Sequence, residues 1–198
     1  MINEKFVLLA AVFNIIGSAG YVIDTLKGKT KPNRMSWLLW AVAPLIAFAA
    51  EIGQHVGLVA LMTFMVGFGP LVVFFASFIN RKSYWCITKL DIVCGVLSVV
   101  ALLLWRVTGT GNVAITLSIA ADLLAGVPTL IKSYVDPASE NYQAFGYGAL
   151  SAAITMLTIK HITFVNFGFP LYIFAICVVL FVLIRFKVGV RNKPLATA

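Results

Sequence analysis

The chain alternates seven long apolar runs with short polar stretches. The runs lie at about 5–26, 35–51, 57–79, 86–106, 113–134, 142–159 and 163–185. A helix of roughly 20 residues crosses the hydrocarbon of a bilayer, which is about 30 Å thick. The pattern therefore predicts an all-α integral membrane protein with seven transmembrane helices.

Composition strengthens this prediction. Of the 198 residues, 61% are hydrophobic and 11% are charged, and the mean hydropathy is +1.00, which is outside the range of soluble domains. The first run is longer than a signal-peptide core and is followed by lysines, so we expect it to remain as a helix. The polar gaps are too short for a separate soluble domain. The three cysteines form no CxxC motif, which favours packing roles over a disulfide framework or a zinc site.

Basic residues gather in alternate gaps. Twelve of the fifteen lysines and arginines lie in or beside the gaps that follow the first, third, fifth and seventh runs: Lys27, Lys29, Lys31, Arg34, Arg81, Lys82, Lys89, Lys132, Arg185, Lys187, Arg191 and Lys193. With seven crossings these lie on one side, so the positive-inside rule places the N-terminus outside and the C-terminus inside. Their spread over four loops argues against nucleic-acid binding, and the net charge of +8 favours contact with anionic lipid. Trp37, Trp85 and Trp105, near predicted helix ends, are expected in interfacial belts.

Short stretches recur along the chain. "GFGPLVVF" at 67–74 matches "FGFPLYIF" at 167–174, and "TLKGKTKPN" at 25–33 matches "LIKSYVDPA" at 130–138. Three helices followed by one linking helix bring a second copy into the membrane in the same direction as the first. The sequence thus predicts a 3+1+3 order of two parallel repeats: 1–80, a linker helix in 81–110, 111–187, and a basic cytoplasmic tail at 188–198.

This organisation resembles the PQ-loop and SWEET-like superfamily of seven-helix membrane transporters. The stretch "DLLAGVPTLIKSYVDPASEN" at 122–141 is similar to a second PQ-loop with Pro128-Thr129 in place of Pro-Gln, whereas "SAGYVIDTLKGKTKPNRMSW" at 18–37 contains no Pro-Gln. The family includes sugar carriers, amino-acid and cystine exporters, and receptors for retention signals. The resemblance therefore implies a fold and does not choose a function.

Asp122 is the one carboxylate expected near the centre of a membrane helix. Such a group costs several kcal/mol unless it faces a wet cavity, is paired or is protonated. Its spacing to Gly126 is similar to that of the proton-coupling aspartate in cystine exporters, which implies a proton-coupling role here. The alternative is an aspartate that bonds a neighbouring helix and only fixes packing.

Four polar or aromatic residues are candidates for substrate binding: Asn14, Tyr21, Trp40 and Asn166. SWEET carriers place an asparagine on the last helix of a repeat at the substrate pocket, as Asn166 is placed here, although Val66 occupies the matching position of the first copy. Interhelical amide bonds explain the two asparagines equally well, and aromatic residues in a chain this rich in them mostly have packing roles.

Candidate moving parts come from prolines and one charged pair. Pro44, Pro70, Pro128 and Pro170 fall inside predicted helices, and in SWEET-like carriers such prolines act as hinges; static kinks are the alternative. Asp24 and Lys27, about one helical turn apart, are expected to form an ion pair at the inner gate.

Enzymatic and cofactor roles find no support in the sequence. His55 and His161 fall in different outer loops and predict neither a metal nor a haem site, and no catalytic motif is present. We therefore expect a non-enzymatic protein without cofactors.

The expected function is alternating-access transport of a small polar solute (an amino acid, sugar or nucleoside), coupled to protons through Asp122. The alternative is a non-transporting seven-helix receptor or scaffold with pH-dependent ligand binding. We expect it in a prokaryotic inner (plasma) membrane, with solute, protons and the lipid bilayer as partners. A monomer and a homo-oligomer are both compatible with the sequence.

Overall fold

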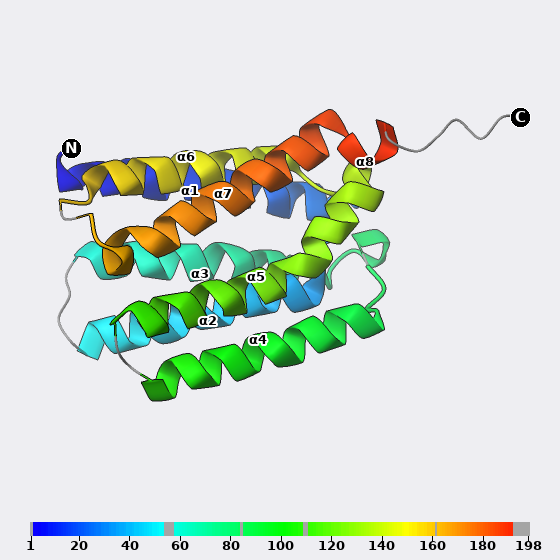
Figure 1. Ribbon diagram of the computed structural model, residues 1–198. Helices are drawn as coiled ribbons and strands as arrows, with labels where there is room; N and C mark the ends of the chain where they lie inside the picture. The colour runs from blue at the N-terminus through cyan, green and yellow to red at the C-terminus, as the bar shows by residue number, and fades with distance from the viewer. Residues whose placement is uncertain (1, 54–57, 84, 109–110, 161, 192–198) are drawn as a thin grey trace, which may run out of the picture.

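A computed structural model describes residues 2–53, 58–83, 85–108, 111–160 and 162–191, which are helical apart from short connections (Figure 1). The seven long helices are α1 (Val7–Leu26), α2 (Arg34–Gly53), α3 (Leu58–Ala76), α4 (Lys89–Thr108), α5 (Gly111–Val135), α6 (Tyr142–Thr158) and α7 (Phe164–Phe186). Short pieces are η1 (Glu4–Phe6), η2 (Arg81–Ser83), η3 (Pro137–Ser139) and α8 (Val188–Arg191). The prediction of seven helices is confirmed, with ends within a few residues.

Three of the helices are long and apolar enough to cross a membrane. The candidate spans among the described residues are Val7–Leu26, Ile115–Val135 and Asn166–Phe186. Their outer faces carry exposed large apolar side chains, such as Ile15 on α1 and Leu171 on α7. Apolar surface of this kind is suited to lipid contact, so the protein is membrane-associated.

The helices pack in two groups with the same internal order. In the first group α3 contacts both α1 and α2, and in the second α7 contacts both α5 and α6. The groups meet where α1 packs on α6 and α2 packs on α5, while α4 lies against α5 and, less extensively, α2. α4 is therefore peripheral to both groups, at the lower edge of Figure 1.

Successive helices run in opposite directions, so alternate connections meet at one end of the molecule (Figure 1). This end holds residues 27–33, 77–83, 85–88 and 136–141 together with the end of α7, and we call it the basic end. The basic residues that the structure describes in these segments lie at this end of the bundle, while the side of the membrane that they occupy stays a prediction. The fold itself therefore gathers the basic residues of these segments at one end of the bundle.

Aromatic side chains form the core where the groups meet. Tyr21 and Trp37 pack with ring centroids 4.5 Å apart, and Trp37 and Phe145 with centroids 6.4 Å apart. Trp37 is only 6% exposed, which corrects its predicted place in an interfacial belt. The correction arises because its face of α2 is turned toward α1 and α6.

Two asparagines begin helices at the basic end and also tie helices together. The Oδ1 atom of Asn33 accepts hydrogen bonds of 3.1 and 3.3 Å from the first turn of α2, and that of Asn141 accepts one of 3.1 Å from α6. Capping of this kind satisfies N–H groups that have no partner within the helix. The Nδ2 groups donate to carboxylates on other helices, Asn33 to Asp91 at 2.7 Å and Asn141 to Asp24 at 2.6 Å. Each side chain therefore starts one helix and fastens another.

Candidate functional site

A cavity of about 120 Å³ lies between the two helix groups, and we call it the central cavity. Its lining comes from α1, α2, α3, α5, α6 and α7. The polar groups in the lining are Asn14 and Ser18 of α1, Trp37 and Trp40 of α2, and Asp122 of α5. An amide, a hydroxyl, indole N–H groups and a carboxylate thus share one small space. Such a set can bind a small polar solute by hydrogen bonds.

Asp122 is held at the wall of this cavity by neighbours on two other helices. The hydroxyl of Tyr172 on α7 donates to its Oδ2 atom at 2.8 Å, and the indole N–H of Trp40 donates to its backbone carbonyl at 3.3 Å. The ion pairs in the described parts of the chain are Lys29–Asp24 and Lys132–Glu140, so neither involves Asp122. A carboxylate bonded to a hydroxyl but to no cation can exchange a proton without breaking an ion pair.

Gly126, one turn after Asp122, makes room for Trp40. A Cβ atom at this position would lie 3.2 Å from Cζ2 of Trp40 and 3.1 Å from Cδ1 of Ile176. Both distances are shorter than comfortable van der Waals contact. The absence of a side chain at Gly126 therefore lets the indole lie against α5 and reach the carbonyl of Asp122, which gives the aspartate–glycine spacing a steric reason.

The structure brings only some of the predicted residues together. Asn14, Trp40, Asp122 and the predicted hinge Pro70 all line the central cavity. Tyr21 does not, because its ring is fully buried and its hydroxyl donates to Glu140 at 2.6 Å. Tyr21 therefore does not line the central cavity, and its predicted contact with a solute stays a prediction.

Asn166 also lies away from the central cavity. It is exposed in the first turn of α7, where its N–H group donates to the Oγ1 atom of the capping residue Thr163 at 3.3 Å. Asn166 does not line the central cavity in this conformation, and its predicted contact with a solute stays a prediction. His55 and His161 lie outside the described residues.

All four predicted prolines lie inside helices: Pro44 in α2, Pro70 in α3, Pro128 in α5 and Pro170 in α7. Each removes one N–H donor from its helix. Their action as hinges stays a prediction.

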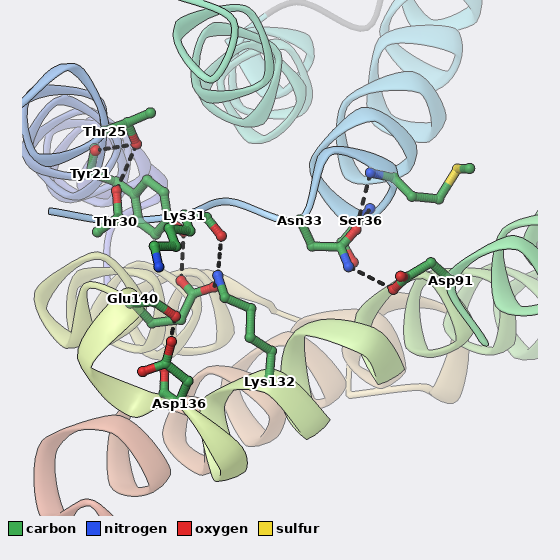
Figure 2. A network of polar contacts seen from close by, with 12 residues as sticks. Tyr21, Thr25, Thr30, Lys31, Asn33, Ser36, Asp91, Lys132, Asp136 and Glu140 are labelled. Atoms are coloured by element: carbon green, nitrogen blue, oxygen red, sulfur yellow. Dashed lines mark hydrogen bonds and ion pairs between the residues drawn. The ribbon is translucent and has the colours of Figure 1, made fainter. Parts of the chain in front are cut away.

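Beyond the cavity, a buried ion pair closes the basic end (Figure 2). The ammonium group of Lys132 lies 2.6 Å from Oε1 of Glu140, and neither side chain has any exposed surface. Lys132 also donates to the backbone carbonyl of Lys31 and stands 5.0 Å from the centre of the Trp85 ring. We call Tyr21, Lys132, Glu140 and the Lys31 carbonyl the basic-end network. It joins α1, α5 and the segments 27–33 and 136–141.

The predicted pair of Asp24 with Lys27 is wrong in its cation. Asp24 lies 3.8 Å from the ammonium group of Lys29 and accepts a bond from Asn141. The chain reverses direction at Gly28, whose φ is 73°, a left-handed conformation that suits glycine. Because of this turn, the backbone N–H of Lys29 also donates a hydrogen bond of 2.9 Å to the backbone carbonyl of Asp24.

Sequence reasoning missed Tyr172 and the pairing of Lys132 with Glu140. Both charged residues lie within the 122–141 stretch that carries the family resemblance, so their opposite charges were available as a signal. Tyr172 follows Pro170 by two residues, but nothing distinguishes it from many other aromatic residues. No group of three or more metal-ligating side chains occurs among the described residues.

Comparisons with known proteins add no relatives. No protein-family model matches the chain, and searches of curated proteins and of solved structures found no match. The resemblance to the PQ-loop and SWEET-like superfamily stays a prediction from the residues quoted above.

Proposed function

We propose that the protein is a carrier that moves a small polar solute across a membrane by alternating access. The observation that carries this proposal is the central cavity, which both helix groups enclose and which contacts the mid-helix carboxylate of Asp122. Ligand sites in transporters lie near the bilayer midplane at the interface of two repeats. An intramembrane carboxylate at such a place is by default a functional group.

The proposed topology is seven crossings in a 3+1+3 order. The shared packing order of α1–α3 and α5–α7 supports two parallel repeats, with α4 as the linker that restores the direction of the second. The basic end would face the cytoplasm, because cytoplasmic loops carry an excess of lysine and arginine. The N-terminus would then be outside and the C-terminus inside.

In the proposed cycle Asp122 takes up a proton from the outer side and delivers it to the inner side together with the solute. Loss of its charge would permit the outer half of the cavity to close. The hydroxyl of Tyr172, 2.8 Å away, would hold the carboxyl toward the cavity in both states. Pro70, which lines the cavity in α3, would serve as one point of bending.

The volume of the cavity limits the solutes that this conformation could hold. About 120 Å³ accommodates roughly four water molecules, whereas sites for larger ligands usually measure about 300 Å³ or more. A hexose or a nucleoside would therefore require the helix groups to separate. Within this proposal, a solute of amino-acid size suits the volume better than a hexose or a nucleoside.

Buried polar atoms without hydrogen-bond partners lie on the parts of α2 and α5 between the cavity lining and the basic end. Four buried polar atoms in the described part of the chain have no hydrogen-bond partner: Oγ of Ser36, Nε1 of Trp37, Oγ1 of Thr129 and Oγ of Ser133. They lie on α2 and α5, which pack together, and the two on α5 follow Asp122 toward the basic end. Buried polar groups normally have partners, so these suit transient contacts with water or solute.

A second candidate function is a receptor with the same fold. It is favoured by the basic-end network, because a fully buried ion pair is a strong closure and a receptor can keep one side shut. In the carrier, by contrast, Lys132 and Glu140 must separate in every cycle.

Transport assays on the purified protein in liposomes distinguish the two functions. Under an imposed pH gradient, proton uptake is measured with pools of amino acids, sugars and nucleosides, for wild type, Asp122→Asn and the control Asp136→Asn, which alters an aspartate outside the cavity. Solute-dependent proton flux that Asp122→Asn abolishes and Asp136→Asn retains would support the carrier. Solute binding without flux in any of the three proteins would support the receptor.

A further inference from the structure

A second and larger hollow lies on the outside of the helix bundle, between α6 and α7. It has a volume of about 400 Å³ and a mostly apolar lining that includes Tyr142, Gly146, Leu150 and Ala153 on α6 and Val178 and Phe181 on α7. Residues 142, 146, 150 and 153 follow helical spacing, so they form one face of α6. We call this hollow the α6–α7 groove. It shares no lining residue with the central cavity.

The groove has the length of one lipid leaflet. From Tyr142 to Ala153 the helix rises roughly 16 Å, and half of the hydrocarbon thickness of a bilayer is about 15 Å. α6 begins at Tyr142, so this end of the groove lies at the basic end (Figure 1). An extended acyl chain placed in the groove would therefore have its headgroup at the basic end.

A cation stands where that headgroup would lie. The guanidinium of Arg185, in the last turn of α7, is 5.5 Å from the centre of the Tyr142 ring and 6.0 Å from that of Phe186. Arg185 is exposed, and neither of the two ion pairs in the described residues includes it. Gln143, also exposed, adds an amide to the same end of the lining. An arginine between two aromatic faces presents a planar set of donors that matches a phosphate group.

We infer that the α6–α7 groove binds the acyl chain of an anionic phospholipid, whose phosphate contacts Arg185. The match of groove length to a leaflet and the charge at one end select a phospholipid over a second protein chain. The site lies apart from the proposed transport path, but its alignment with one leaflet rests on the proposed topology, in which α6 crosses the membrane from the basic end.

Competition between lipids in native mass spectrometry tests this site. Purified protein in detergent receives equal amounts of phosphatidylglycerol and phosphatidylcholine, and the retained lipid is counted for wild type, Arg185→Gln, Arg81→Gln and Ala153→Phe. Arg81 is a matched control, since it is an exposed arginine at the basic end in η2. Melting temperatures show which variants remain folded, and Ala153→Leu replaces Ala153→Phe where the larger ring unfolds the protein.

Wild type is expected to prefer phosphatidylglycerol. Arg185→Gln should lower that preference by about fivefold, the effect of one basic residue near an anionic surface, while Arg81→Gln retains it. Ala153→Phe, which fills the groove, should reduce retention of both lipids. Equal losses in Arg185→Gln and Arg81→Gln would overturn the site, because they would indicate general attraction of charge. Lipid retention that is undiminished in a folded groove-filling variant would also overturn the site. So would a wild-type dimer that the groove-filling substitution dissociates without any loss of bound lipid.

Discussion

The ion pair of Lys132 and Glu140 should dominate the stability of the basic end, and Lys132→Met tests this. The substitution leaves the carboxylate of Glu140 fully buried, with the Tyr21 hydroxyl 2.6 Å away as its remaining side-chain partner. Removing one member of a buried pair costs about 3–5 kcal/mol, because the other charge stays desolvated. For a chain of this size, 1 kcal/mol corresponds to about 2–4 °C in melting temperature. The expected decrease is therefore roughly 6–20 °C.

The double variant Lys132→Met/Glu140→Leu isolates the interaction. Apolar replacement of both members removes the buried charge, so the double variant should be more stable than Lys132→Met alone. The coupling between the two substitutions should be about 2–3 kcal/mol, within the usual range for residues in one network. The orphaned hydroxyl of Tyr21 and carbonyl of Lys31 keep the double variant below wild type.

Thermal unfolding of the purified protein in detergent, followed by circular dichroism, measures these changes. Lys29→Met is the control, since Lys29 has a side chain that is 67% exposed and lies 3.8 Å from Asp24. An exposed pair of this kind contributes about 0–1 kcal/mol. If Lys132→Met lowered the melting temperature no more than Lys29→Met, the ion pair would not dominate the stability of the basic end. Additive effects of Lys132→Met and Glu140→Leu would lead to the same conclusion.

Two further substitutions test the packing and the caps. Gly126→Ala should destabilise the protein by about 1–3 kcal/mol and change the fluorescence of Trp40, because the new methyl group displaces the indole. The control is Gly20→Ala, which should be neutral or stabilising because no neighbouring atom lies within 4 Å of its Cβ position. Equal effects of the two substitutions would contradict the steric argument. Asn33→Ala should cost about 2–4 kcal/mol in thermal unfolding, since it removes the cap of α2 and a hydrogen bond to the buried carboxylate of Asp91. A loss in Asn33→Ala below about 1 kcal/mol, the value of a cap alone, would show that the bond to Asp91 contributes little.

Helix number and approximate ends followed from the sequence because long apolar runs leave few alternatives to helices. The side of the bundle to which each loop belongs followed as well, since it depends only on the count of helices. The position of Trp37 did not follow. Its distance from the helix end suggested an interface, but which face of α2 is buried depends on neighbours that are distant in sequence.

The candidate site shows the same division. Asp122 was found because a lone carboxylate within an apolar run is rare, and Asn14 and Trp40 were found beside it. The pairing of Lys132 with Glu140 was not found, because it depends on how residues 136–141 pack against the end of α5. Asp24 was assigned the wrong cation for a similar reason, since the left-handed turn at Gly28 decides which lysine lies close to its carboxylate.

The capping asparagines also bear on how descent is traced in membrane proteins. At lipid-facing positions one apolar side chain replaces another with little effect, so the two halves of a duplicated chain lose their similarity quickly there. A side chain that starts a helix and also holds an aspartate of another helix has few substitutes. We therefore expect positions such as Asn33 and Asn141 to change more slowly than lipid-facing positions. A sequence search that gives more weight to helix starts should then detect relationships that a comparison of hydropathy alone misses.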